Sequence, residues 1–181
     1  MKLEKTPLKD CFVLTPEVFI DHRGKFLESY HKKKFNEVTG LDLDFVQDNQ
    51  SVSKKGVLRG LHFQSGEFSQ AKLVRVIHGE VMDVVVDLRP DSPTFKKSHH
   101  IILSDQNQHQ LFIPQGFAHG FITLSETSVF SYKCDRFYSP GSESGVIYND
   151  PDLSIDWKIP ENEFILSEKD TKLPTLKDLF T

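Results

Sequence analysis

The chain has 181 residues, of which 38% are hydrophobic and 27% are charged, and 15 of them are phenylalanine. This composition supports one sizeable core, so it predicts a single domain over residues 1–181 and excludes a disordered chain. The formal net charge of −4 argues against nucleic acid or an anionic membrane as a partner, because such surfaces are usually bound by an excess of basic residues.

Short runs rich in β-branched and aromatic residues recur along the chain, separated by Gly, Pro, Asn, Asp or Ser, and each run is typical of a strand. In chain order the predicted strands are Phe12 to Leu14, Lys25 to Tyr30, Phe45 to Asn49, Val57 to Gln64, Lys72 to Ile77, Val81 to Leu88, His100 to Leu103, Gln110 to Ile113, Gly120 to Leu124, Ser128 to Cys134 and Ser144 to Tyr148. Many short strands indicate an all-β sandwich or barrel.

Two of these strands, Lys72 to Ile77 and Val81 to Leu88, flank the tripeptide His78-Gly79-Glu80. A tight turn between two strand-like runs predicts a β-hairpin.

Helical periodicity is scarce. A short helix is predicted from Lys32 to Val38, closed by Gly40, and a terminal helix is predicted to begin near Pro174. The spacing Ser167-x-x-Asp170 matches a capping box, which would make Asp170 a residue of a helix start.

The segment GVLRGLHFQ, residues 56–64, carries Arg59 and His62 among apolar neighbours. Strict alternation would point these two side chains to opposite faces of a strand. A bulge at Gly60 would bring them to one face. His62 is then a candidate base, whereas the plainer interpretation is a core or surface histidine.

Three further segments carry candidate chemistry. Lys72 shares the parity of apolar strand residues, so it either extends to water or faces a ligand oxyanion, with Asp83 as a possible counter-charge. A Pro-x-Gly turn in IPQGFAHGF brings His119 into an apolar strand. In SYKCDRFYSP, Tyr132 and Tyr138 are further candidates, although most tyrosines in such positions are simply packed with the hydroxyl at a rim.

Other chemistries are weakly supported. A metal-binding cupin normally has two histidines one residue apart, and Gln64 occupies the second position here. His99-His100 would point to opposite faces of a strand, and His109 lies in a polar turn. In GSESG, Glu143 stands where a nucleophile elbow needs serine, and the chain contains no GxxxxGK[ST] or GxGxxG motif.

The segments DHRGKFLESY, FVQDNQSVS, GVLRGLHFQ, KLV, GEVMDVVVDLRPDSPTF, LFIPQGFAHGF, YSPGSESGVIYNDPDLSIDW and LSEKD occur in this order over nearly the whole chain. Together they resemble the dTDP-4-dehydrorhamnose 3,5-epimerase family. The resemblance implies a cupin-type jelly roll that forms a homodimer and works without metal or organic cofactor. It also implies an isomerase that converts dTDP-4-dehydro-6-deoxy-D-glucose to dTDP-4-dehydro-L-rhamnose, in dTDP-L-rhamnose and cell-surface polysaccharide biosynthesis.

The same resemblance implies a role for each catalytic residue. His62 would remove the protons from C3 and C5, and Asp170 would orient and charge its imidazole. Lys72 would stabilise the enolate oxygen at C4, and Tyr132 would return a proton from the opposite face.

Binding roles are implied for a larger set of residues. Arg59 and His119 would lie near the sugar and the phosphates, Tyr138 would stack on thymine, and Glu143 and Lys169 would complete the site. The residues expected around the nucleotide, some of them reaching across the dimer, are Arg23, Glu28, Gln47, Asp48 and Asn49.

Three alternatives stay open. Relatives with this fold act as single-centre epimerases, as ketoisomerases or on other nucleotide sugars. The chain could instead be a non-catalytic nucleotide-sugar binding module or a metal-dependent cupin enzyme.

Cys11 and Cys134 form no CxxC motif, and no segment has signal-peptide or membrane-spanning character. We therefore expect a soluble protein of the reducing cytoplasm.

Overall fold

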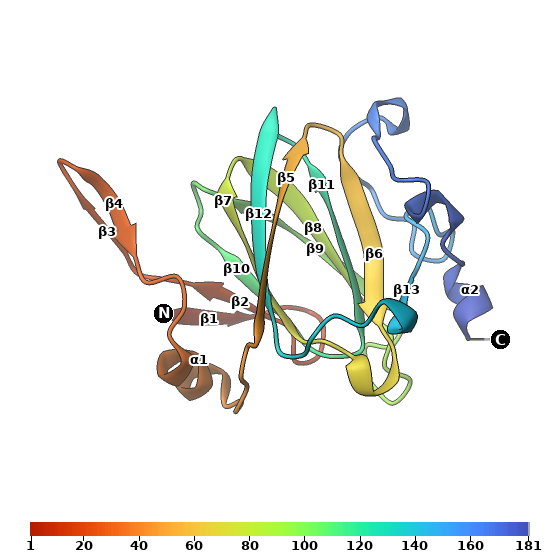
Figure 1. Ribbon diagram of the computed structural model, residues 1–181, viewed down its shortest axis with the longest axis horizontal. Coiled ribbons are helices and arrows are strands. Elements are labelled where there is room, and N and C mark those ends of the chain that lie inside the picture. The colour runs from red at the N-terminus through yellow and green to blue at the C-terminus, as the bar shows by residue number, and fades with distance from the viewer. Residues whose placement is uncertain (181) are drawn as a thin grey trace.

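The computed structural model describes residues 1–180 and consists of two β-sheets packed face to face, with a two-stranded arm projecting from one end (Figure 1). The first sheet contains β1 (Lys2–Lys5), β2 (Phe12–Thr15), β5 (Gln47–Lys54), β7 (Lys72–His78), β10 (Gln110–Ile113) and β12 (Thr127–Cys134). The second contains β6 (Leu58–Gln64), β8 (Glu80–Asp87), β9 (Ser98–Ser104), β11 (Phe117–Thr123) and β13 (Glu143–Gly145). The arm consists of β3 (Val18–Asp21) and β4 (Gly24–Leu27).

The remaining elements are short. They are the helices α1 (Lys32–Thr39) and α2 (Leu176–Leu179) and the 3-10 turns η1 (Gly66–Phe68), η2 (Pro140–Ser142), η3 (Glu161–Glu163) and η4 (Asp170–Lys172). Gly40 ends α1 in the left-handed conformation with φ of 72°, and a capping box between Thr175 and Asp178 begins α2. Among residues 1–180, none of the helices is long and apolar enough to cross a membrane.

The strand order is β1-β2-β10-β7-β12-β5 in the first sheet and β13-β6-β11-β8-β9 in the second, with antiparallel pairing throughout. Most consecutive strands after β5 lie in opposite sheets, so the chain crosses repeatedly from one to the other. This topology confirms the expected all-β jelly roll. β1 and β3 were not among the predicted strands, and in β1 the polar sequence KLEK explains why.

The predicted hairpin at His78-Gly79-Glu80 is wrong. β7 pairs with β10 and β12, whereas β8 pairs with β9 and β11 in the other sheet. The turn is held from outside, because Gly79 N–H donates to Asp105 Oδ2 at 2.8 Å and Glu80 N–H donates to Ser125 Oγ at 2.8 Å. These side chains take the place of cross-strand bonds, so the connection bends from one sheet to the other.

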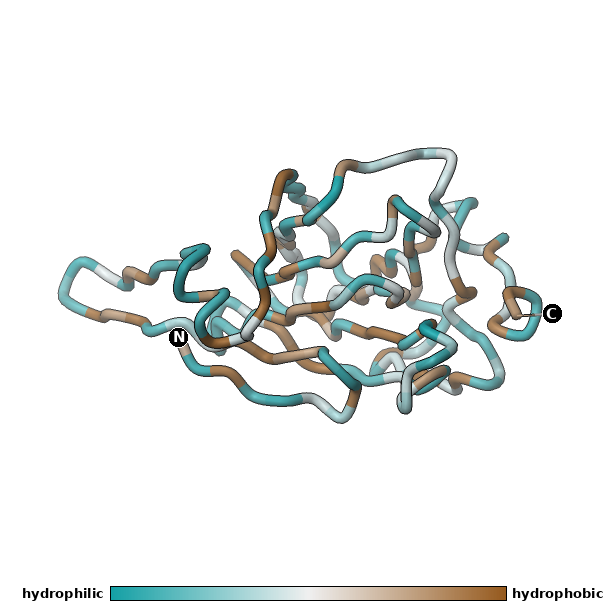
Figure 2. The backbone as a smooth tube through the Cα atoms, turned by 90° about the horizontal axis from the view of Figure 1, so that it is seen from below, coloured by the Kyte–Doolittle hydropathy of each residue, from teal (hydrophilic) through white to brown (hydrophobic). Residues whose placement is uncertain are grey.

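Apolar side chains form three clusters, one of which packs Phe35 of α1 against Phe112 of the first sheet. The interior between the sheets contains residues such as Val74, Val85 and Phe130. The outer face of the second sheet is covered by the C-terminal segment, whose Trp157 belongs to the same cluster as strand residues such as Met82. Figure 2 shows apolar stretches along the strands and polar ones at the loops and the arm tip. Because β8 is covered on both faces, its side chains are nearly all buried.

Candidate active site

A β-bulge in β6 aims two polar side chains at the space between the sheets. Between the register pairs His119↔His62 and Phe121↔Arg59, β6 has one residue more than β11. A Cβ on Gly60 would lie 2.7 Å from the Gly120 Cα, so glycine is required at this close approach. The predicted bulge is confirmed, and it places Arg59 and His62 on the same side of the strand, along one cavity.

His62 contacts Asp170, which lies 108 positions further along the chain. The Nε2 to Oδ1 distance is 2.5 Å, and Asp170 is only 3% exposed. Burial alone would raise the pKa of Asp170. The hydrogen bond and charge of His62, together with Ser167 and the Gly60 backbone, outweigh burial and lower it. An ionised Asp170 accepts the Nε2 proton, which leaves Nδ1 of a neutral imidazole as the basic nitrogen.

Of the two hydrogen bonds that make up the capping box predicted at Ser167, one forms. Asp170 N–H donates to Ser167 Oγ at 3.1 Å, but the Asp170 carboxylate bonds to His62 and the Gly60 backbone instead of returning to the backbone N–H of Ser167. Asp170 begins η4, a 3-10 turn. Ser167 therefore fixes the backbone that delivers the carboxylate, a role that the sequence signals only as a helix start.

Lys72 begins β7 and borders the same cavity. Its ammonium lies 5.9 Å from the centre of the Tyr132 ring. Burial lowers the pKa of Lys72, and the charges of Cys134, Asp83 and Glu143 act in the opposite direction. Asp83 had been expected as a counter-charge on a paired strand. It faces Lys72 from the opposite sheet instead, because β7 and β8 are not paired.

Tyr132 on β12 and His62 on β6 belong to different sheets and border one cavity from its two walls. Burial, followed by the nearby Cys134 and Glu143, raises the pKa of the Tyr132 hydroxyl, so the phenol stays protonated at neutral pH. The site thus places a basic imidazole and a protonated phenol on opposite sides of a space with an ammonium group beside it. Such a set can move protons on two faces of one ligand.

The cavity between these groups has a volume of about 560 Å³. Of the residues expected in a site, those that border it are His62, Lys72, Tyr132, Asp170, Asn49, Arg59, His119 and Lys169. Arg59 is held by Nε donation to Ser53 Oγ at 3.1 Å, a contact that the sequence analysis missed. Ser53 carried no usable signal, since it is one of two serines, with Ser51, in the second half of a largely polar strand.

His119 is held by a second buried carboxylate. Its Nε2 lies 2.8 Å from Asp83 Oδ2, and the exposed fractions of the two residues are 7% and 0%. The Pro-x-Gly turn before it forms as predicted, with Gly116 at φ of 82° between β10 and β11. The cavity therefore contains two histidines, each bonded to its own aspartate.

Lys169, which borders the cavity, connects it to a second bonded group whose members Tyr138, Glu143 and Gln47 lie outside the cavity lining. Glu143 Oε2 accepts from Tyr138 Oη at 2.6 Å and from Lys169 Nζ at 2.5 Å. Gln47 Oε1 accepts from the Tyr138 backbone N–H at 3.0 Å. Tyr138 is 49% exposed, so one face of its ring is available for a flat ligand.

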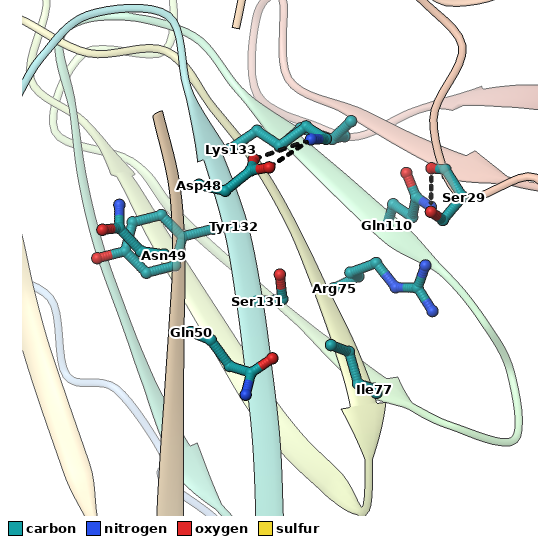
Figure 3. A pocket seen from close by; sticks show the side chains of 11 residues that line it. Ser29, Asp48, Asn49, Gln50, Arg75, Ile77, Gln110, Ser131, Tyr132 and Lys133 are labelled. Carbon is teal, nitrogen blue, oxygen red and sulfur yellow. Dashed lines mark hydrogen bonds and ion pairs between the residues drawn. The ribbon is translucent and has the colours of Figure 1, made fainter. Parts of the chain in front are cut away.

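Asp48 lies away from the cavity. It forms an ion pair with Lys133 at 2.8 Å on the outer face of the first sheet, where both border a hollow of about 390 Å³ that also contains Arg75 and Gln110 (Figure 3). Alternation explains the separation, because Asp48 points opposite to Gln47 and Asn49 on β5. Asp48 therefore does not border the cavity of its own chain, and its expected place near the nucleotide stays a prediction.

Arg23 and Glu28 also lie outside the cavity. Arg23 sits at the tip of the β3–β4 arm, pairs with Asp21 at 2.6 Å and has a side chain that is 79% exposed. Glu28 pairs with Lys34 at 2.8 Å. Both Figures 1 and 2 show the arm extending away from the sheets. These residues do not contribute to the cavity of their own chain.

The residues next to His62 do not form a metal-binding cluster. Gln64 Oε1 accepts from Ser139 N–H at 2.6 Å, and Gln64 Nε2 donates to the carbonyl of Phe68 at 3.0 Å. Throughout residues 1–180, no group of three or more His, Cys, Asp or Glu is placed to hold a metal ion. Gln64 instead fixes the loop that carries Tyr138.

Comparisons with known proteins agree over nearly the whole chain. A family model described as dTDP-4-dehydrorhamnose 3,5-epimerase matches residues 5–178. The chain is similar to the dTDP-4-dehydrorhamnose 3,5-epimerase of Salmonella typhimurium, at 51% identity over 175 residues that cover 95% of this chain and 93% of the relative.

Two solved structures show the same likeness. One is the dTDP-4-dehydrorhamnose 3,5-epimerase from Elizabethkingia anophelis, with 60% identity, a TM-score of 0.94 and coverage of 98% of this chain and 97% of that one. The other is the dTDP-6-deoxy-D-glucose-3,5-epimerase from Legionella pneumophila in complex with dTDP-4-keto-L-rhamnose, with 46% identity, a TM-score of 0.94 and coverage of 99% and 94%.

Proposed function

The chain belongs to the dTDP-4-dehydrorhamnose 3,5-epimerase family, and we propose that His62, Asp170, Lys72 and Tyr132 carry out its reaction. The activity is that of an isomerase, which inverts C3 and C5 of dTDP-4-dehydro-6-deoxy-D-glucose. The observation that supports these four roles is the placement of His62 and Tyr132 on opposite sheets around one cavity, with Lys72 beside Tyr132. Inversion needs a base on one face of a carbon and an acid on the other.

The first step is removal of a proton from the carbon next to the C4 ketone. His62 Nδ1 takes the proton, and the electrons of the broken C–H bond move into the enolate, whose charge lies on the C4 oxygen. Asp170 holds the tautomer and stabilises the resulting imidazolium. A positioned base of this kind contributes about 10²- to 10⁴-fold in rate.

The second step is reprotonation from the other face. Lys72 stabilises the negative oxygen, and the Tyr132 hydroxyl donates its proton to the carbon, which restores the ketone with inverted configuration. Proton exchange between the imidazolium, the phenolate and solvent returns both groups to their starting states. The same pair then acts on the second carbon flanking C4.

Turnover in D₂O tests this mechanism. The purified protein should place deuterium at both C3 and C5 of the product, and replacing His62 by alanine should abolish wash-in at both carbons. Label at a single carbon would identify a monoepimerase, and wash-in by the alanine variant would refute His62 as the base. Binding of dTDP without any turnover would indicate a binding module.

The nucleotide site combines the bonded group around Glu143 and the arm in this proposal. Tyr138 stacks on the thymine while Gln47, Asn49, Glu143 and Lys169 surround the nucleotide, and Arg59 and His119 contact the phosphates and the sugar. The contacts of Tyr138 with Gln47 and Glu143 support this arrangement. Asp48 would take part only through its backbone.

A homodimer completes the site in this proposal. The arm exposes Phe19, Ile20 and Phe26 at 54%, 79% and 69%, an unusual apolar surface for a soluble monomer. Packing of the arm on a second copy would cover these side chains and bring Arg23 and Glu28 to the partner's nucleotide. We place this one epimerase domain in the cytoplasm, which the free, buried thiols of Cys11 and Cys134 support.

A further inference from the structure

Asp83 is a buried carboxylate for which the mechanism above has no use. It lies in the middle of β8, in the sequence VMDVVVD, and is 0% exposed. Its Oδ2 accepts from His119 Nε2 at 2.8 Å, but Oδ1 is buried without a hydrogen-bond partner among residues 1–180. A buried polar atom without a partner costs about 1 to 3 kcal/mol. An apolar residue would suit stability better, so the carboxylate calls for another explanation.

The contact with Asp83 determines how His119 meets the cavity. An ionised Asp83 requires the proton of a neutral imidazole to be on Nε2, which leaves Nδ1 as the nitrogen for a ligand. The ring is further fixed by stacking on Phe130, with a centroid distance of 6.0 Å and an interplanar angle of 24°. His119 borders the cavity, so its free nitrogen is oriented before any ligand arrives.

Asp83 also acts on the ammonium of Lys72. The groups that act electrostatically on Lys72 are Cys134 on β12, Asp83 on β8 and Glu143 on β13, and Tyr132 offers its ring. Glu143 is already bonded to Lys169 and Tyr138. The pKa of Asp83 is raised, because burial outweighs the lowering effects of His119, Lys72 and His99 on β9. Lys72 has the parity of Val74 on β7 and Asp83 has the parity of Val85 on β8, and both valines pack between the sheets, so the two charged side chains point into the same interior. When Asp83 is ionised, its buried charge is poorly screened and acts on Lys72.

We propose that Asp83 is a positioning residue beside the cavity, where it orients His119 through Nε2 and, when ionised, places a negative charge in the same interior as the Lys72 ammonium. This inference rests on the proposed function, because a protonated Lys72 matters only if an enolate forms beside it. Asp83 itself touches neither the sugar nor the reacting carbons.

Asp83→Asn tests the charge while preserving the shape. We expect kcat to fall about 10- to 100-fold because transition-state stabilisation beside Lys72 is lost, and KM to rise as well because His119, which contacts the sugar and phosphates in the proposed function, loses the carboxylate that orients it. Without the buried anion Lys72 loses its proton more easily, so the alkaline limb of the kcat profile should move to lower pH by about one unit. If Asp83→Asn kept the wild-type kcat, and its kcat fell over the same alkaline pH range as in the wild type, Asp83 would have no role toward Lys72.

The effect of Asp83 on the His119 tautomer can be measured by NMR in the absence of substrate. Long-range ¹⁵N–¹H spectra of the wild-type protein, with His119 assigned through His119→Asn, should show the neutral ring protonated on Nε2, and Asp83→Asn should alter that pattern. Protonation on Nδ1 in the wild type would overturn the positioning role even if the variant failed to fold. Because these spectra need no substrate, an error in the proposed function leaves this result interpretable.

Asp87→Asn is the matched control. Asp87 lies on the same strand, is also 0% exposed, and is bonded to Arg89, Ser92 and Thr94 instead of to the cavity residues. Its replacement should lower the melting temperature but leave the alkaline limb and the His119 spectrum unchanged. If both variants moved the limb equally, general destabilisation would explain the effect and the inference would fail.

Discussion

His62 on β6 and His119 on β11 are cross-strand partners, and each imidazole is held by a different buried carboxylate. Side chains paired in this way have Cβ atoms about 4.5 to 5.5 Å apart. Asp170 reaches His62 from a C-terminal 3-10 turn, whereas Asp83 reaches His119 from the neighbouring strand β8. The two rings therefore border one cavity but are supported by separate parts of the chain, so their roles can be separated by mutation.

Replacing Asp170 by asparagine should lower kcat by about 10²- to 10⁴-fold, because the amide no longer fixes the His62 tautomer or stabilises its charged form. Steady-state kinetics on the dTDP-sugar measures the effect, and KM should change little. Ser167→Ala is the graded comparison, since it removes one hydrogen bond to the Asp170 backbone and should reduce kcat less than tenfold. Equal losses in the two variants would contradict the assigned role of the carboxylate.

Replacing Tyr132 by phenylalanine should separate exchange from inversion. The variant keeps the ring near Lys72 but loses the hydroxyl that donates to the second face. In D₂O, His62 can still remove a proton and return deuterium from its own side, so the recovered substrate should gain label while epimerised product is lost. Full product formation by the variant would show that another group donates the proton.

The bulge in β6 makes Gly60 sensitive to the smallest change. Gly60 has φ of +113°, and a Cβ there would lie 2.7 Å from both the Gly120 Cα and the His119 carbonyl oxygen. Gly60→Ala should lower stability by about 2 to 4 kcal/mol and displace His62, with loss of activity. Gly141→Ala is the control, because no atom lies within 4 Å of its added Cβ. Urea unfolding and turnover of both variants measure the contrast, and a fully active Gly60→Ala would refute the requirement.

The exposed arm should drive dimerisation. Phe26→Asp places a charge on an apolar surface that is 69% exposed in the single chain, so sedimentation should show monomers where the wild type shows dimers. Phe180→Asp is the comparison, since Phe180 is 40% exposed and lies near the C-terminus, at the end of the molecule opposite the arm (Figure 1). If Phe26→Asp formed dimers as tightly as the wild type, the arm would not be the dimer contact.

Much of the fold was predictable because alternation is a local property. The strand Gln110–Ile113 has the same bounds in sequence and structure, and α1 begins at Lys32 and is closed by Gly40 as predicted. Strand partners are not local, however. The turn at Gly79 looks like a hairpin in the sequence, but its N–H bonds to Asp105, 26 positions away. Such contacts exist only after the two sheets have closed.

The site also contains features that local sequence predicts and contacts that it does not. The bulge at Gly60 was predictable because glycine between two polar residues breaks an alternation that otherwise separates them. The contact of His62 with Asp170 spans 108 positions, and local pattern alone made Asp170 a helix-start residue. Only the ordered set of family motifs placed the two together. Asp48 lies outside the cavity of its own chain, because neighbours in a motif point to opposite faces of a strand.

Asp87 predicts how the stability of the fold depends on pH. Burial would raise the pKa of this carboxyl, but hydrogen bonds from Arg89, Ser92 and Thr94 lower it from 3.8 to about 2. A lowered folded-state pKa adds stability that is complete above the unfolded pKa and is lost as pH falls through 3.8 toward about 2. Asp87→Asn should therefore cost about 2 kcal/mol at pH near 6, measured by urea unfolding. The difference in free energy of unfolding between variant and wild type should be smaller at pH near 3 than at pH near 6. If that difference stayed constant between the two pH values, Asp87 would not contribute through its charge.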